Sequence, residues 1–188
     1  MNKKNAGAEI PVELQDFSDD INRLAHDTQN GYSFAKVSFI YQRLRELGPF
    51  DPETISMDAI FALDMMQSAF VVEYARIFVG GTRKVSKSKV PAHLQKIHET
   101  IMDLRNKRYA HEDGHESVEN FLELQILDDQ IVVDTKANIG IALGAPPEWD
   151  ALITWLGEYL FEQRKKQLQR LADVTGYKWN SRSEENSS

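Results

Sequence analysis

The stretch LRNKRYAHED, residues 104–113, holds the side chains best suited to chemistry in this chain. Within seven positions it carries three cations, the amide of Asn106 and the imidazole of His111. An imidazole transfers protons near neutral pH, and a guanidinium offers a planar pair of donors to a phosphate oxygen. The stretch is therefore a solvated helix end, a surface that faces RNA, or a catalytic site.

The helix that precedes these side chains determines where they are expected to lie. Apolar residues at helical spacing predict a helix from about Pro91 to His111. Its apolar stripe consists of Leu94, Ile97, Ile101 and Leu104. Since each residue advances ~100° around a helix, Arg108 continues this stripe, and Arg105 and His111 flank it. Because burying guanidiniums without partners is costly, the helix either emerges into solvent there or lines a pocket or a subunit interface.

Residues 81–109 form a basic segment in an acidic protein. They carry eight lysines and arginines against two carboxylates, whereas the whole chain has a net charge of −7. A solvated loop and helix face explain this charge, and the helix macrodipole favours each cation near a C-terminus by about 0.3–1 kcal/mol. The net charge argues against a protein that coats nucleic acid with its whole surface, but it permits a local RNA-binding patch.

The stretch RNKRYAH resembles the signature of the HEPN superfamily. In that signature an arginine, usually followed by a polar residue, is separated from a histidine by about four to six positions. Arg105, Asn106 and His111 match it, with five residues between the arginine and the histidine. Residues 55–115 have a long buried helix, a lysine-bearing loop, and a helix that ends in this motif and an acidic pair. In these features they are similar to the AbiU2-like branch of the superfamily.

The resemblance implies a metal-independent endoribonuclease that acts as a homodimer, with two Arg–His motifs in a cleft between the subunits. Such enzymes use the neighbouring 2′-hydroxyl of RNA as nucleophile, leave a 2′,3′-cyclic phosphate and need no cofactor. His111 is then the general base or acid, Arg105 stabilises the pentavalent transition state, and Asn106 orients the histidine or the substrate. The expected RNA-binding residues are Lys84, Lys87, Lys107, Arg108 and Tyr109.

Asn106 does not fit a regular helix in this role. On an ideal helix its side chain points away from those of Arg105 and His111. The conflict disappears if the helix loosens near Tyr109, or if Asn106 acts across the dimer. Tyr109 itself either stacks on a base or packs against the protein.

Three functional hypotheses follow. Proteins of the HEPN type are often toxins or phage-defence effectors, which implies a cytoplasmic location and an antitoxin or nucleotidyltransferase partner for the ribonuclease. The second hypothesis is a non-catalytic module of the same fold that binds RNA, a nucleotide or a protein partner. The acidic net charge and the divergence of Asn106 favour it. The third is a structural helical protein in which the motif is a solvated helix end.

Other site chemistries have no support in the sequence. The chain has no cysteine, which excludes disulfides, thiolate nucleophiles and Cys-ligated zinc sites. His111 and His115 have the spacing of a metal pair, but Gly114 lies between them and no third ligand beyond Asp113 is evident, so no metal site is expected. There is no P-loop and no serine-hydrolase elbow. No export signal and no apolar stretch of membrane-spanning length are visible, so no contact with a membrane is expected.

The apolar pattern predicts a mainly α fold, an antiparallel bundle of about five helices. The helices are expected at about residues 11–28, 33–47, 59–79, 91–111 and 149–173. The break between the first two rests on the sequence Asn30-Gly31-Tyr32.

A β insertion is expected at about residues 120–144. Alternating segments rich in Ile and Val predict a hairpin with its turn at residues 128–129, and residues 138–143 are a candidate third strand of a small meander. We expect a single HEPN-like domain over residues 1–176 and a disordered tail over residues 177–188.

The third helix is expected to be deeply buried. Its apolar stripe is expected to consist of Phe61, Met65, Ser68, Ala69, Val72 and Arg76, widened by Leu63, Phe70, Tyr74 and Phe78. Ser56 is a candidate N-cap. Asp64 and Glu73 are candidates to pair with Arg76 or to reach His111. His93 and His98 are five positions apart, and both are expected at the surface.

Overall fold

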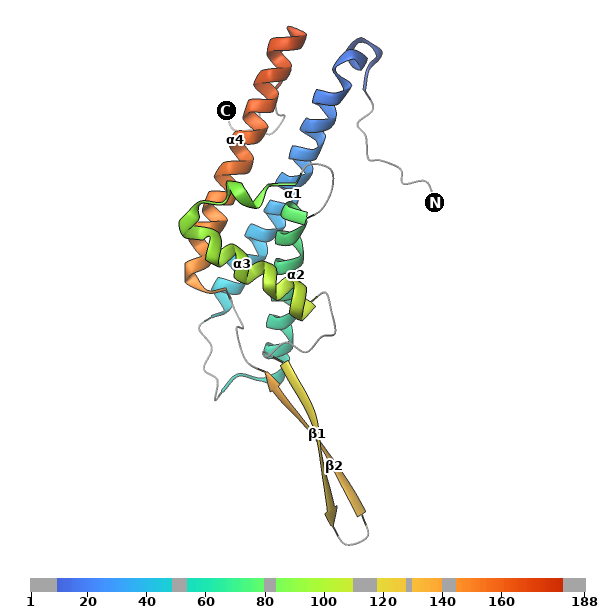
Figure 1. Ribbon diagram of the computed structural model, residues 1–188, viewed down its shortest axis with the longest axis vertical. Coiled ribbons are helices and arrows are strands. Elements are labelled where there is room, and N and C mark those ends of the chain that lie inside the picture. The colour runs from blue at the N-terminus through green and yellow to red at the C-terminus, as the bar shows by residue number, and fades with distance from the viewer. Residues whose placement is uncertain are drawn as a thin grey trace.

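Four α-helices surround one hydrophobic core in the computed structural model of the chain (Figure 1). The structure describes residues 10–48, 54–79, 84–109, 118–127, 130–139 and 145–180. Within them the helices are α1 (Ser18–Leu47), α2 (Met57–Val79), α3 (Gln95–Asp103) and α4 (Asp150–Thr175), and the strands are β1 (Val118–Leu127) and β2 (Gln130–Ile139). The prediction of a mainly α fold with a small antiparallel sheet before the last helix is confirmed.

The predicted break in the first part of the chain is wrong. The two helices expected there form the single helix α1, which continues through Asn30, Gly31 and Tyr32, so the described residues contain four α-helices and not about five. One glycine inside a helix costs only about 1 kcal/mol relative to alanine. Because α1 packs against both α2 and α4, the tertiary contacts along its length outweigh this cost.

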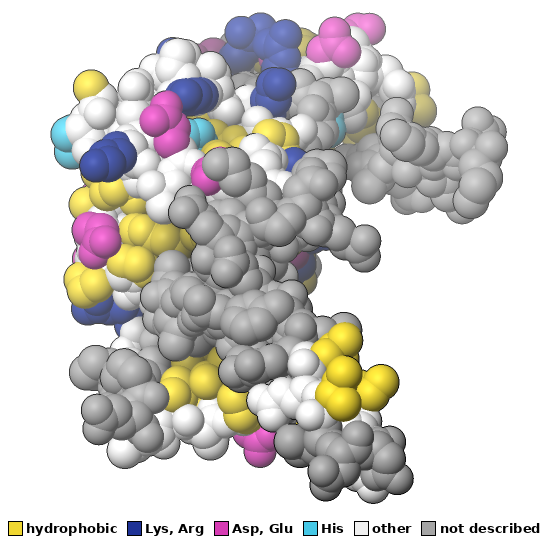
Figure 2. Space-filling view, turned by 60° about the horizontal axis from the view of Figure 1, so that its bottom comes forward, with side chains coloured by type: hydrophobic (Ala, Val, Ile, Leu, Met, Phe, Trp, Pro, Cys, Tyr) yellow, Lys and Arg dark blue, Asp and Glu magenta, His cyan; other side chains and the backbone are white. Residues whose placement is uncertain are grey.

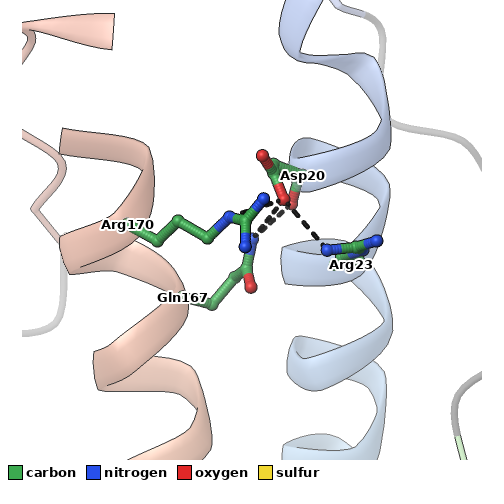
Figure 3. Close-up of polar contacts among 4 residues, drawn as sticks. All are labelled: Asp20, Arg23, Gln167 and Arg170. Carbon is green, nitrogen blue, oxygen red and sulfur yellow. Dashed lines mark hydrogen bonds and ion pairs between the residues drawn. The ribbon is translucent and has the colours of Figure 1, made fainter. Parts of the chain in front are cut away.

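Helix α1 runs antiparallel to α2 and to α4, and a polar cluster joins α1 to α4 at the end far from the hairpin (Figures 1 and 3). The backbone oxygen of Asp20 accepts a hydrogen bond of 3.0 Å from Gln167 Nε2. The carboxylate of Asp20 lies 3.1 Å from Arg170 Nε and 3.4 Å from Arg23 Nη1. Exposed ion pairs contribute little to stability. The side chain of Gln167 is buried, however, and leaving its amide without this acceptor would destabilise the folded protein. The cluster therefore fixes how the two helices align.

The polar contacts of α2 agree with the sequence. The hydroxyl of Ser56 accepts a hydrogen bond of 3.2 Å from the backbone N–H of Ala59, which confirms the predicted N-cap. Glu73 pairs with Arg76 at 2.6 Å, which was one of the candidate pairings, and reaches Lys36 of α1 at 3.2 Å. Glu73 therefore ties α2 to α1 as well as to its own next turn.

The predicted apolar stripe of α2 lies on the wrong side of the helix. Phe61, Met65 and Val72 are 56%, 68% and 36% exposed. The buried face is instead the set that was expected only to widen the stripe, Leu63, Phe70, Tyr74 and Phe78. Since α2 has apolar residues on all sides, its periodicity does not identify the side that faces α1 and α3.

Aromatic rings run through the core in a column. The ring of Phe70 lies 6.0 Å from that of Tyr41 on α1 and 5.3 Å from that of Trp149, which precedes α4. The column continues along α2 to Tyr74, 6.2 Å from Phe70, and then to Phe78, 4.9 Å from Tyr74. These contacts join α1, α2 and the start of α4 into one body.

The predicted hairpin is confirmed and extends away from the helices (Figure 1). Its register aligns Leu124 with Val133 and Ile126 with Ile131, so these four side chains share one face. They are between 56% and 78% exposed, and Figure 2 shows hydrophobic side chains gathered over the hairpin. The hairpin therefore presents an aliphatic face that the described residues of this chain do not cover.

The described part of the candidate third strand, residues 138 and 139, does not form a separate strand. Residues 138 and 139 belong to β2, and the described residues contain a two-stranded sheet. The predicted turn at residues 128–129 and the rest of the candidate strand lie outside the described residues, as do residues 181–188 of the predicted tail. Among the described residues no helix has the length and apolar character to cross a membrane.

Two helical glycines differ in how closely the neighbouring helix approaches them. A Cβ on Gly157 of α4 would lie 2.7 Å from Cζ of Phe34 on α1, whereas a Cβ on Gly31 would meet nothing within 4 Å. We expect Gly31→Ala to raise the free energy of unfolding by about 1 kcal/mol through helix propensity. We expect Gly157→Ala to lower it by about 1 kcal/mol, because overpacking costs about 1–3 kcal/mol. Urea unfolding measures both.

The reversed sign should depend on the ring of Phe34. In a Phe34→Ala background the contact is gone, so Gly157→Ala should then stabilise the protein about as much as Gly31→Ala does. If Gly157→Ala stabilises the otherwise unchanged protein, α1 and α4 do not approach each other this closely.

Candidate functional site

The motif begins on a π-helical turn. Helix α3 ends at Asp103, and Leu104–Tyr109 continue as π-helix. A π-helix bonds residue i to residue i+5, so its turn is wider and its side chains rotate away from α-helical positions. The segment packs against α2, with Leu104 buried. Such turns occur frequently at functional sites, and this one replaces the regular helix that was predicted to reach His111.

The first two motif residues contact each other. Arg105 Nη1 donates a hydrogen bond of 2.8 Å to Asn106 Oδ1. Arg105 is half-buried and Asn106 is exposed. The sequence predicted that a regular helix would point these two side chains apart, and that a loosened helix would remove the conflict. The wide turn and the hydrogen bond bring the guanidinium and the amide together at one edge of the helix.

The other predicted site residues are only partly described. His111 lies outside the described residues. Lys107, Arg108 and Tyr109 belong to the π-helical turn by their backbone, and their side chains lie outside the description. The remaining two candidates, Lys84 and Lys87, are exposed on the segment that follows α2.

A depression of about 330 Å³ lies beside the motif. It is formed by the end of α2, the segment after it, and one face of α3 that continues onto the π-helical turn. The residues that line it are Phe78, Val79, Lys87, His98, Glu99, Met102, Asp103 and Asn106. Two residues chosen from the sequence, Lys87 and Asn106, therefore border the same depression.

His98 is buried beneath this depression, and its predicted surface position is wrong. It is 3% exposed, while His93 is exposed as predicted. His98 Nδ1 and the hydroxyl of Tyr74 form a hydrogen bond of 2.8 Å, and the His98 ring lies 4.5 Å from that of Phe78. The sequence could not reveal this position, because the polar partner that permits burial lies on another helix.

Burial keeps both partners of this hydrogen bond uncharged. It lowers the pKa of His98 from its ordinary value of 6.5, and the positive charge of Lys87 lowers that pKa further, while Glu99 opposes both effects. Burial also raises the pKa of Tyr74, so this side chain stays a phenol. At neutral pH the bond therefore joins a neutral imidazole to a neutral hydroxyl.

The rim of the depression carries an ion pair. Lys87 Nζ lies 2.7 Å from Glu99 Oε1, and both side chains are more than half exposed. The hydrogen bond from Lys87 and its positive charge lower the pKa of Glu99, so the carboxylate is ionised at neutral pH. The pair places a donor and an acceptor side by side at the mouth of the depression.

A sequence signal for this face exists, although the apolar stripe drew attention away from it. Glu99, Met102, Asp103 and Asn106 recur at spacings i, i+3, i+4 and i+7, which place them on one helix face. The structure brings these four residues to the depression. Glu99 and Asp103 were missed because, taken alone, they are typical charged residues of a solvated helix face. Only their position on the same face as Asn106 indicates that they belong to the candidate site.

Among the described residues no group of three or more His, Asp or Glu side chains is placed to hold a metal ion. Comparison of the chain with family models, curated proteins and solved structures gives no match. A functional assignment therefore depends on the motif and on the geometry around it.

The stability of the protein should depend on pH through His98. This residue is neutral in the folded state but titrates near its ordinary value of 6.5 in the unfolded state, so the unfolded chain binds more protons below that pH. The free energy of unfolding should therefore fall as the pH drops from about 6.5, with a slope of at most about 1.4 kcal/mol per pH unit. Urea unfolding at several pH values between about 7.5 and about 5 measures this change in the free energy of unfolding.

Two variants isolate the contribution of His98. His98→Gln keeps a polar partner for Tyr74 but does not titrate, so it should flatten the pH dependence. His93→Gln removes an exposed imidazole and should leave the wild-type dependence in place. Equal slopes for the wild type and His98→Gln would contradict a neutral, buried His98.

Proposed function

We propose that the protein is a metal-independent endoribonuclease of the HEPN type that acts as a homodimer in the cytoplasm. The observation that carries the proposal is the hydrogen-bonded pair of Arg105 and Asn106 on a π-helical turn beside a polar depression. A guanidinium held at a helix end by a neighbouring amide is preorganised to receive a phosphate oxygen, which is what transition-state stabilisation requires.

The proposed reaction is an internal transfer at one phosphodiester. His111 removes the proton of the 2′-hydroxyl, the 2′-oxygen attacks phosphorus, and the bond from phosphorus to the 5′-oxygen breaks. A protonated imidazole, from the same motif or from its symmetry mate, gives a proton to the leaving 5′-oxygen. Arg105 stabilises the charge on the pentavalent phosphorane, and the products are a 2′,3′-cyclic phosphate and a 5′-hydroxyl.

Two apolar surfaces support a subunit or protein partner. The outward face of α2 exposes Phe61, Met65 and Val72, and the hairpin exposes its aliphatic face. Exposed apolar surfaces of this kind commonly mark interaction sites, and an isolated two-stranded hairpin gains stability when another element covers it. In a toxin or phage-defence effector, an antitoxin or a nucleotidyltransferase is a natural second occupant.

The second candidate is a non-catalytic module of the same kind that binds RNA, a nucleotide or a protein. The ion pair of Lys87 with Glu99 favours it, because a lysine engaged by a carboxylate contributes less to holding a phosphate. The net charge of −7 points the same way.

The ribonuclease proposal predicts loss of cleavage without loss of structure. We expect His111→Ala and Arg105→Ala each to reduce RNA cleavage by at least about 100-fold, as removal of an acid–base group or a transition-state donor does. The thermal melt should move by less than about 2 °C, since the proposal gives both side chains a role toward the substrate and none in the hydrophobic core. Total RNA is incubated with the purified protein in EDTA, and the 3′ ends are mapped for cyclic phosphate.

The matched control is His93→Ala, which removes an exposed imidazole on the same stretch of chain and should retain full cleavage. Retention of full activity by His111→Ala would reject the proposed chemistry. RNA that binds but shows no new ends would select the non-catalytic module.

A further inference from the structure

The depression beside the motif differs chemically from a phosphate site. Two carboxylates, Glu99 and Asp103, border it together with one lysine and the amide of Asn106. Carboxylates repel a phosphate but accept hydrogen bonds from N–H groups. Its apolar lining comes from Phe78, Val79 and Met102. Acceptors at a rim and apolar side chains within suit a flat, uncharged ring system that carries donors along one edge.

We propose that this depression is a base-recognition subsite that takes a guanine of the RNA substrate. The inference rests on the proposed function for its substrate, and it adds the identity of the base that the enzyme selects. A volume of about 330 Å³ falls within the range of small-ligand sites, which begins at about 300 Å³. Single-stranded RNA offers its bases unstacked, so an exposed rim can reach their hydrogen-bonding edges.

The order of donor and acceptor on the rim is what selects guanine. The Watson–Crick edge of guanine presents the acceptor O6 next to two donors, N1–H and the N2 amino group. The ammonium of Lys87 can donate to O6 while the Glu99 carboxylate, 2.7 Å from it, accepts from N1–H and N2–H. The carboxylate has about four lone-pair sites, so it serves the lysine and the base together.

The other bases fit this pattern poorly. Adenine turns the lone pair of its N1 toward the carboxylate and keeps one donor, its amino group. Cytosine likewise offers one amino donor beside the acceptors N3 and O2. Uracil presents its single N3–H donor between two carbonyl oxygens. Lys87 can donate to one of them, as it does to guanine O6, but the other faces the carboxylate, which repels it. Guanine therefore gains two hydrogen bonds to Glu99, whereas each competitor gains at most one and faces an acceptor.

Asn106 connects this subsite to the proposed chemistry. Its side chain borders the depression and accepts the hydrogen bond from Arg105. A guanine bound to Glu99 at the rim would therefore lie in the depression that Asn106 borders, and Asn106 in turn contacts Arg105, whose guanidinium is proposed to bind the reacting phosphate. The subsite places the selected base next to the scissile bond and gives sequence preference to the cut.

The deciding experiment maps cleavage on synthetic single-stranded RNAs that differ only in one base. We expect cleavage beside G to be at least about tenfold faster than beside A, C or U, and inosine, which lacks the N2 amino donor, to lose most of that advantage. Glu99→Gln should reduce the preference for G about tenfold while cleavage beside other bases persists. Glu162→Gln, a control on the exposed side of α4, should leave the preference unchanged.

A binding measurement separates this inference from the proposed function. Guanosine, inosine, adenosine, cytidine and uridine are compared by saturation-transfer NMR with wild type and Glu99→Gln. If RNA is not cut but guanosine binds more tightly than the other nucleosides, and Glu99→Gln weakens it, the subsite holds and the ribonuclease proposal fails. Cleavage without base preference, or a preference for G that Glu99→Gln leaves intact, overturns the guanine subsite. Equal binding of all nucleosides by a protein that does not cut RNA overturns it as well.

Discussion

The hydrogen bond between Tyr74 and His98 is the contact on which the geometry of the site depends. Helix α3 has nine residues, and a helix that short does not hold its own orientation in water. Ile101 and Leu104 bury its apolar side, but apolar contacts tolerate small rotations. A hydrogen bond between two buried polar groups does not tolerate such a rotation, since each group costs about 1–3 kcal/mol of stability when left without its partner. The bond of 2.8 Å therefore fixes the rotation of α3 against α2 and, with it, the direction in which Glu99 and Asp103 face.

The same contact ties the candidate site to the rest of the core. The ring of Phe78 lies tilted against that of His98, and Tyr74 continues to Phe70, whose ring contacts Tyr41 of α1 and Trp149, directly before α4. A site supported by such a column moves as part of the helical body, which is the condition for holding a guanidinium in one place. The π-helical turn then begins where this support ends, at the buried Leu104. Its position explains how Arg105 and Asn106 can depart from helical geometry without disturbing the core.

What the sequence could predict is what local rules decide. The cap at Ser56, the pair of Glu73 with Arg76, the hairpin and the final helix all follow from spacing over a few residues. The failures share a different cause, because each depends on a neighbour distant in sequence. Packing on α2 and α4 carries α1 through Gly31, contacts with α1 and α3 choose the buried side of α2, and Tyr74 permits the burial of His98. For the site, the motif pointed to Arg105 and Asn106, and helical spacing places Glu99 on the same face as Asn106. The π-helical turn and the depression depend on packing against α2, which no local rule predicts.

Under the proposed function, the charged side chains of this surface have two different roles, and this difference reconciles an acidic protein with an RNA substrate. Lys87 would contribute little to phosphate binding, because the carboxylate of Glu99 lies 2.7 Å from its ammonium group and offsets its charge. In the proposed subsite, Lys87 and Glu99 together form one hydrogen-bonding edge for a base, and the carboxylate offsets the attraction of the lysine for a phosphate. Under the proposed function, the attraction for the RNA backbone is left to cations outside this pair, such as Arg105 and Lys84. On this view the local carboxylates do not weaken the case for RNA. In the proposed subsite they are the groups that would distinguish one base from another, which cations alone do not do.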